Sequence, residues 1–383
     1  MTVRIERRLS QPRWLSVAVP ICSLAVAFLL IAVVLLATGH DPLQTYKDLF
    51  EAAFTADGAL SQTLVGATPL LFTGLAAAAA FRMNLFNIGG EGQLYFGAIG
   101  SSGAGLLLAG QSAPVLIAAM MIGGFAAGAA WALIPGFLRA YLSTNEIITS
   151  LMLNYVAGLF LTYLIFDSSS YWRDTTSASA AVFPIGKELS DAASWPTVGS
   201  SVVVPFGFLV GIVAAIGLWA LYSRTRFGFE VQVMSDSPRA ARYSGMRTRR
   251  KILAVMGLSG GLAGLGGASQ VGDFLHTLDA DPNGLRAYGY GYTGIVVAAL
   301  ARYNPFAVVL VAFLIGGLQN AGISLQGPDF PSGLVGVMEG MILFTTLGGE
   351  LFVRYRIRLG RRRHGSQAPD VPAEPATAAE AAR

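Results

Sequence analysis

Apolar residues in this chain gather in blocks of about 20, each bounded by charged residues, Pro or Gly. A helix of about 20 apolar residues is long enough to span the hydrocarbon core of a bilayer. Apolar residues make up 54% of the chain and charged residues only 13%, which is about half the charged share of an average soluble domain. This pattern excludes a set of soluble domains and predicts an all-α polytopic membrane protein.

The blocks predict ten transmembrane helices. Segment 93–109 is rich in Gly, and segment 288–301 is too short to cross a bilayer straight. The short segment is therefore expected to be a half-helix or a re-entrant piece. The ten expected spans are 17–38, 62–81, 93–109, 114–134, 147–166, 202–222, 252–271, 288–301, 305–325 and 331–352.

The distribution of Lys and Arg sets the orientation, because cytoplasmic loops carry an excess of both. With the N-terminus in the cytoplasm, the outer segments hold four of the 26 Lys and Arg residues, namely Lys47, Arg173, Lys187 and Arg286. The even number of spans returns the Arg-rich C-terminus to the cytoplasm. Membrane orientation thus accounts for the net charge of +4, and no nucleic acid is expected as a partner.

The expected spans divide the chain into three parts. Residues 1–16 form a cytoplasmic segment, and 17–352 form the transmembrane domain with a large cytoplasmic loop at 223–251. Residues 353–383 form a basic cytoplasmic tail, expected to be largely disordered because few large apolar residues occur near its end. The single cysteine, Cys22, and three scattered histidines exclude a disulfide framework and a readable thiol or imidazole metal site.

The longest polar interruption within the apolar stretch runs from Asn84 to Gln93 with almost no solvent loop. Polar side chains at membrane depth usually mark a pathway, and Gly lets the backbone leave the helix where it lines a cavity. Asn84, Asn87, Glu91 and Gln93 are therefore candidates for the substrate pathway. An equally weighted interpretation is a tight cytoplasmic turn, with Glu91 capping the next helix or paired with Arg82.

Further polar residues lie in or beside later spans. Asn145 is expected to cap the helix from 147 onward, with Glu146 favoured in its first turn. Asn154 lies two turns into that span and is a further pathway candidate. Glu339 lies in mid-span, where a carboxylate must be protonated, paired or facing water. A local hydrogen bond is the favoured role for Glu339, and proton coupling is the alternative.

The Gly-rich run from Gly257 to Gly272 does not match the phosphate-binding pattern G-x-x-x-x-G-K-[ST], which occurs nowhere in the chain. Gly260, Gly264 and Ala268 instead follow the small-xxx-small spacing that permits close helix contact in membranes. The run therefore predicts helix packing rather than a nucleotide site.

The cytoplasmic loop 223–251 contains a short helix with clear end signals. Ser237 can cap it, Pro238 suits its first position, and Gly245 can end it. A basic loop that serves only for orientation or lipid headgroups does not need a capped, Ala-rich element. We therefore expect this helix to dock on another protein.

These residues together resemble the permease subunits of ATP-binding-cassette importers for simple sugars, nucleosides and branched-chain amino acids. The loop resembles their A-A-x-x-x-G coupling motif, although Arg239 stands where Glu is common. Closer similarity to the nucleoside-type members lies in 86–93, 145–148, 151–155 and 289–292. The resemblance covers about residues 15 to 355. The coupling residues it implies are Ser237, Pro238, Arg239, Ala240, Ala241 and Gly245.

The resemblance implies several partners. Two cytoplasmic ATPase subunits, which use ATP and Mg, would dock at 236–246, so no cofactor is expected in this chain and no enzymatic activity of its own. A second, related permease subunit would complete the pore, and an extracytoplasmic binding protein would deliver substrate. The implied location is the plasma (inner) membrane of a bacterium.

Three classes of function remain open. The leading one is a binding-protein-dependent permease, with nucleosides ahead of ribose-like sugars and branched-chain amino acids. A secondary transporter would couple protons through Glu91 or Glu339, but it has no need of the capped cytoplasmic helix. An intramembrane enzyme would need a catalytic pair such as Ser–Lys or two aspartates, and the spans contain no such pair.

Overall fold

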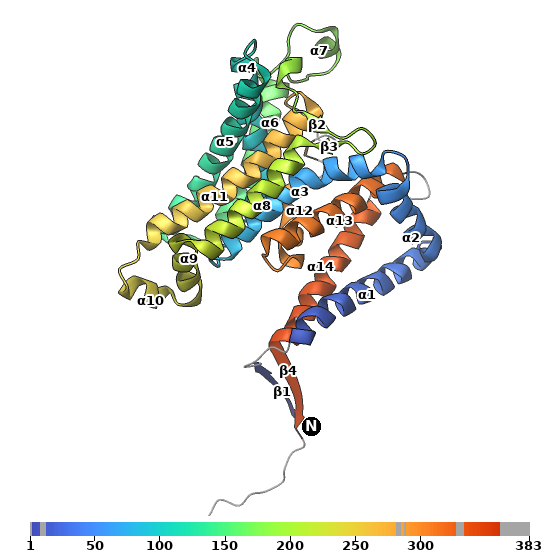
Figure 1. Ribbon diagram of the computed structural model, residues 1–383, viewed down its shortest axis with the longest axis vertical. Coiled ribbons are helices and arrows are strands. Elements are labelled where there is room, and N and C mark those ends of the chain that lie inside the picture. Colours follow the sequence, from blue (N-terminus) through green and yellow to red (C-terminus); the bar gives the residue numbers. More distant parts are fainter. Residues whose placement is uncertain (1, 8–12, 281–284, 287–288, 327–332, 361–383) are drawn as a thin grey trace, which may run out of the picture.

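A computed structural model describes residues 2–7, 13–280, 285–286, 289–326 and 333–360 (Figure 1). The helices are α1 (Arg13–Ala37), α2 (Pro42–Phe50), α3 (Ala59–Phe81), α4 (Gly90–Leu107), α5 (Ala113–Leu142), α6 (Glu146–Thr162), α7 (Ala178–Val182), α8 (Phe206–Arg224), α9 (Arg226–Asp236), α10 (Pro238–Tyr243), α11 (Thr248–Ser269), α12 (Tyr290–Leu300), α13 (Pro305–Ser324) and α14 (Gly333–Arg354). Single π-helical turns extend α2, α6 and α11, at Glu51–Thr55, Tyr163–Asp167 and Gln270–Leu275.

The predicted all-α membrane fold is confirmed, and a helix lies in each of the ten expected spans. Within the described residues, six helices are long and apolar enough to cross a membrane, or seven if α1 and α2, bent by 116°, count as one span. The predicted count of ten crossings is therefore less firm than the fold, because α12 is short, α1 is bent against α2, and α4 is not among the helices long and apolar enough to cross.

The depth at which α12 begins follows from its contact with α3. The Thr73 hydroxyl donates to the Tyr290 carbonyl at 2.9 Å, and Thr73 lies about two turns, or about 12 Å, before the end of α3. The far end of α12 is level with the end of α3, since Arg82 Nε donates to the Tyr303 carbonyl at 3.3 Å. The 11 residues of α12 therefore run beside only the C-terminal half of α3, as expected for a half-helix.

The core centres on α3, which is buried along almost its whole length. Beside it, α5 and α11 pack closely, because a methyl group on Gly128 or Gly264 would collide with backbone of the opposite helix. The predicted packing role of the small residues in α11 is confirmed. Helices α1, α2 and α14 form a second, smaller core with the end of α13, and in Figure 1 α1 and α14 extend away from the main bundle.

Four short strands complete the described residues. Strand β1 (Thr2–Arg7) pairs antiparallel with β4 (Tyr355–Gly360), which lies at the start of the tail expected to be largely disordered. This pairing was not predicted, and residues 361–383 lie outside the described part. Strands β2 (Thr197–Val198) and β3 (Val204–Pro205) form an outer hairpin. Figure 1 places β1, β4, α9 and α10 toward one end and α7, β2 and β3 toward the other.

Candidate functional site

The polar segment between α3 and α4 is non-helical, and the polar side chains of Asn87 and of Gln93, in the first turn of α4, are buried inside the bundle. Asn87 and Gln93 exchange two amide hydrogen bonds, each 2.9 Å long, and their side chains are 3% and 1% exposed. Asn87 also donates to the Ser259 hydroxyl on α11 at 2.9 Å. In this conformation the two amides satisfy each other, so they fix the segment against α11.

Asn154, a residue of α6, forms hydrogen bonds with the same segment. Its Oδ1 accepts from the Gly92 amide at 2.9 Å, and its Nδ2 donates to the Ile88 carbonyl at 2.8 Å. The same Nδ2 lies 3.3 Å from the hydroxyl of Tyr292, whose ring is 40% exposed. Asn154 thus joins the buried polar segment to an aromatic ring on the accessible face of α12.

Glu91 lies where the first turns of α4 and α12 meet, and it is 3% exposed. Its Oε1 accepts from the Tyr95 hydroxyl at 2.6 Å, and its Oε2 accepts from the Gly291 amide at 2.5 Å. Helix α12 has no side-chain cap of its own because its N-cap residue is Gly289. Glu91 therefore caps α12 from a different helix, because its side chain accepts from an N–H group in the first turn of α12.

The suggested pairing of Glu91 with Arg82 is wrong. Arg82 donates to the Tyr303 carbonyl and stacks over the Tyr222 ring at 5.2 Å. Partial burial lowers the pKa of this guanidinium from its usual value, and the nearby Tyr222 acts in the opposite direction. The start of α4 lies deeper than Arg82, so the two charged groups are at different levels of the bundle.

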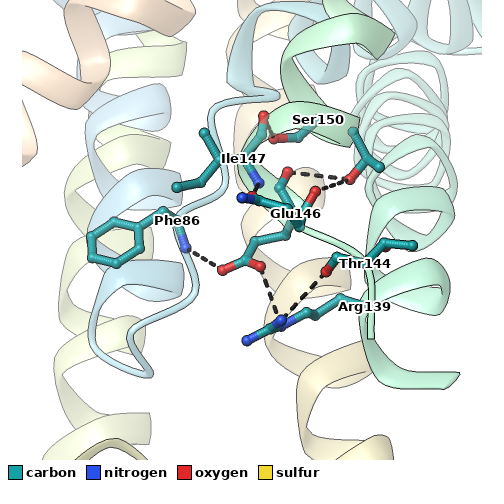
Figure 2. A network of polar contacts seen from close by, with 8 residues as sticks. Phe86, Arg139, Thr144, Glu146, Ile147 and Ser150 are labelled. Atoms are coloured by element: carbon teal, nitrogen blue, oxygen red, sulfur yellow. Dashed lines mark hydrogen bonds and ion pairs between the residues drawn. The ribbon is translucent and has the colours of Figure 1, made fainter. Parts of the chain in front are cut away.

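A second network fixes the N-terminal end of α6 (Figure 2). Asn145 caps the helix by accepting from the Ile147 amide at 2.9 Å, as predicted. Glu146 forms an ion pair of 3.2 Å with Arg139 at the end of α5 and accepts from the Phe86 amide at 3.4 Å. The polar segment is therefore attached to Glu146 at the start of α6, and Glu146 is in turn paired with Arg139 at the end of α5.

Glu339 belongs to a separate group on α12, α13 and α14. Its Oε2 accepts from the Thr293 hydroxyl at 3.3 Å, and Thr293 accepts from Gln319 at 3.5 Å. Its Oε1 is buried without a hydrogen-bond partner among the described residues. The local hydrogen bond expected for Glu339 is present, and no contact of its side chain with the Glu91 group occurs in the described part of the chain.

The predicted cytoplasmic helix is present as α10. Ser237 Oγ accepts from the Ala240 amide at 3.4 Å, Pro238 is the first helical residue, and Gly245 takes a φ of +73° just after the end. Of the six coupling candidates only Ala241 is buried, so it anchors the helix. Tyr243, which the sequence analysis did not single out, is 93% exposed.

One contact joins the α9–α10 region to the polar segment. Asn84 Nδ2 donates to the Ser235 hydroxyl at 2.8 Å and to the Ser235 carbonyl at 3.1 Å. Ser235 lies in the last turn of α9, two residues before Ser237, the cap of α10. Asn84 therefore anchors the polar segment to the end of α9.

Comparison with known proteins identifies the family. Residues 59–347 match the family described as the permease component of branched-chain amino acid transport systems. The chain belongs to this family. It is 32% identical to a glucose ABC transporter permease of Haloferax volcanii, over 96% of each chain. It is 30% identical to a nucleoside ABC transporter permease of Lactococcus lactis, over 86% of this chain and 90% of the relative.

A guanosine ABC transporter permease of Bacillus subtilis is also 30% identical, over 85% of this permease and 91% of the relative. The family match begins at α3 and runs into α14, so it includes the polar segment, α10 and the half-helix α12. The permease is thus a membrane-spanning subunit of an ABC importer, so the importer-permease role expected from the sequence is confirmed.

Proposed function

We propose that this permease imports nucleosides, with ATP hydrolysed by separate cytoplasmic ATPase subunits. The support for the substrate is the similarity, along most of both chains, to relatives named as nucleoside and guanosine permeases. A second candidate is a hexose or ribose-like sugar, since the Haloferax relative is named as a glucose permease. Branched-chain amino acids, the substrates in the family's description, are a third class that the same experiment tests.

The support for ATPase docking is the exposed face of α10. Pro238, Arg239, Ala240 and Tyr243 are all exposed at the cytoplasmic end, while Ala241 holds the helix to the bundle. An exposed aromatic beside Arg is typical of the centre of a protein interface. The ATPase would move α10 as a unit, and the Ser235–Asn84 contact would carry that movement to the polar segment.

The substrate route is proposed along the accessible side of α12 and α6. Tyr292 is partly exposed there, and Asn154 and Glu91 lie directly behind it. Aromatic faces and amide groups suit a ligand that has both a base and a ribose. The hydrogen bonds of Asn84, Asn87 and Gln93 would fix the wall of the route. Glu339 would stabilise α12 through its hydrogen bond to Thr293.

The remaining partners are proposals of the same kind. A second permease subunit would complete the route, and a substrate-binding protein would meet the outer end near α7 and the β2–β3 hairpin. The lipid bilayer would be the plasma membrane of a bacterial cell. ATP and Mg would bind the partner ATPase and not this permease.

Uptake of labelled uridine and adenosine, in cells with and without this chain, tests the substrate. Loss of uptake on deletion, resistant to excess glucose, ribose and leucine and sensitive to ATP depletion, is the expected result. Loss of glucose, ribose or leucine uptake with intact nucleoside uptake would move the substrate to that class. Nucleoside uptake that survives ATP depletion but fails with an uncoupler would contradict the ATP-driven mechanism.

Docking is tested separately with Tyr243→Glu. Because the ring is almost wholly exposed, the change leaves folding intact but places a charge in the proposed interface. We expect loss of ATPase copurification and of uptake, with normal amounts of permease in the membrane. Tyr243→Phe is the matched control and retains both. Full copurification with Tyr243→Glu would remove α10 from the interface.

A further inference from the structure

A basic cavity of about 700 Å³ opens on the cytoplasmic side between α9 and the start of α11. Its charged lining residues are Arg226, Arg247, Arg250, Lys251 and a single acid, Glu230. The volume is within the range of sites that hold small ligands. None of these residues has a role in the docking face or in the substrate route described above.

The positive charge of this cavity is largely uncompensated. Lys251 and Glu230 form an ion pair of 2.7 Å, which uses the only acidic group in the lining. Arg226, Arg247 and Arg250 are exposed and form no ion pair within the ranges that the structure describes. Three like charges around one hollow repel each other, so an anion bound between them would lower the energy of the site.

The position of the cavity indicates where the anion comes from. Helix α8 spans the membrane and ends at Arg224, and α11 begins its crossing at Thr248, so the cavity lies between two cytoplasmic helix ends. Phe229, in the cavity wall, is 64% exposed. Aromatic rings together with Arg at the end of a span are typical of the headgroup layer. A soluble anion would make no apolar contact with the exposed ring of Phe229, whereas a lipid would.

We propose that this cavity binds the phosphate headgroup of an anionic phospholipid, held by Arg226, Arg247 and Arg250. The phosphate takes hydrogen bonds and charge from the guanidinium groups, which match its geometry. The acyl chains lie against Phe229 and the adjoining surface. Ser244 and Gly245, at the end of α10, form part of the same lining, so the bound lipid would steady the α10 end of the loop.

The test is lipid binding by the full-length chain in neutral detergent, followed by native mass spectrometry. Phosphatidylglycerol and phosphatidylcholine with identical acyl chains are titrated separately. We expect at least about tenfold tighter binding of phosphatidylglycerol, and loss of that preference in Arg226→Gln/Arg250→Gln. The matched control, Arg224→Gln/Arg242→Gln, removes the same charge from exposed positions outside the cavity and keeps the preference.

Three results would overturn the proposal. Equal binding of the two lipids, or equal losses in both double variants, would mean that no specific headgroup site exists. Displacement of phosphatidylglycerol by an equimolar amount of inorganic phosphate would assign the cavity to the free anion. Unchanged lipid binding with loss of ATPase copurification in the cavity variant would assign the arginines to the partner protein. The measurement does not depend on transport, so it stands apart from the substrate proposal.

Discussion

The Glu91 carboxylate accepts a hydrogen bond from the Gly291 amide, so a side chain at the start of α4 caps the N-terminus of α12, 200 residues later. Both helices begin inside the bundle, where side chains accept from their first N–H groups: Asn154 accepts from Gly92 in α4, and Glu91 accepts from Gly291 in α12. The Glu91 side chain thus stabilises the place where the N-termini of α4 and α12 meet. This contact connects the polar segment to the half-helix beside the proposed route.

Glu91→Ala is expected to destabilise the permease and impair uptake. The change leaves the Tyr95 hydroxyl and the Gly291 amide buried without an acceptor. Each unsatisfied group should lower the free energy of unfolding by about 1–3 kcal/mol. Thermal unfolding in detergent and nucleoside uptake measure the two effects. Glu91→Gln keeps an acceptor oxygen and should lose less. A melting temperature and uptake equal to wild type in Glu91→Ala would assign Glu91 no part in either.

Gly291→Ala tests how closely α4 and α12 approach. A methyl group at this position would overlap the backbone of Gly90 and Glu91, which cannot move aside as a flexible side chain can. We expect little folded protein in the membrane. The control is Gly217→Ala in α8, where no atom lies within 4 Å of the added methyl group, and its yield should match wild type. Normal yield of Gly291→Ala would contradict the close contact.

Asn84→Ala should separate ATP hydrolysis from transport, because it removes the link from α9 to the polar segment. In the reconstituted complex we expect ATPase activity to persist while uptake per ATP hydrolysed falls several-fold. Ser235→Ala removes only the hydroxyl contact and leaves the carbonyl contact of 3.1 Å, so its effect should be smaller. If uptake per ATP hydrolysed is unchanged in Asn84→Ala, the Asn84–Ser235 contact takes no part in coupling.

The Arg139–Glu146 pair predicts an unequal double-mutant cycle. Glu146→Ala should lower the free energy of unfolding more than Arg139→Ala, because Glu146 also accepts from the Phe86 amide and is more buried, at 7% side-chain exposure against 40%. The coupling between the two should be at most about 1 kcal/mol, since solvent screens the exposed guanidinium. Denaturation of the two single variants and the double variant gives the value. A larger loss for Arg139→Ala would contradict this account.

Glu339→Gln distinguishes structural support from proton coupling. Gln keeps an acceptor for the Thr293 hydroxyl and removes a charge from mid-span, so stability and uptake should equal or exceed wild type. Uptake is measured at several external pH values, with Glu339→Ala as the variant that loses the acceptor. Loss of uptake in Glu339→Gln, with normal folding, would instead favour a proton-coupled transporter.

The sequence was most informative where a feature is local. The helix at 238–243 could be predicted because Ser, Pro and Gly mark its ends within a few residues, and Asn145 could be predicted as a cap for the same reason. The short length of 288–301 already indicated a half-helix. Periodic small residues likewise predicted the tight face of α11.

Long-range partners could not be predicted in this way. Gly291 has no side chain that would identify it as the partner of Glu91, and local spacing placed Glu91 beside Arg82 instead. Tyr292 was present in a motif of the family resemblance, but its exposure depends on where α12 sits in the bundle. The burial of Ala241 depends on the packing of α10 against its neighbours, which its short motif does not encode.

The pairing of β1 with β4 places the described beginning and end of the chain side by side. A short linker between the two strands would therefore close the backbone into a ring. New ends could then be opened in an outer loop, such as 183–205, without breaking a spanning helix. A circularly permuted permease of this kind would display both of its ends on the face proposed to meet the substrate-binding protein.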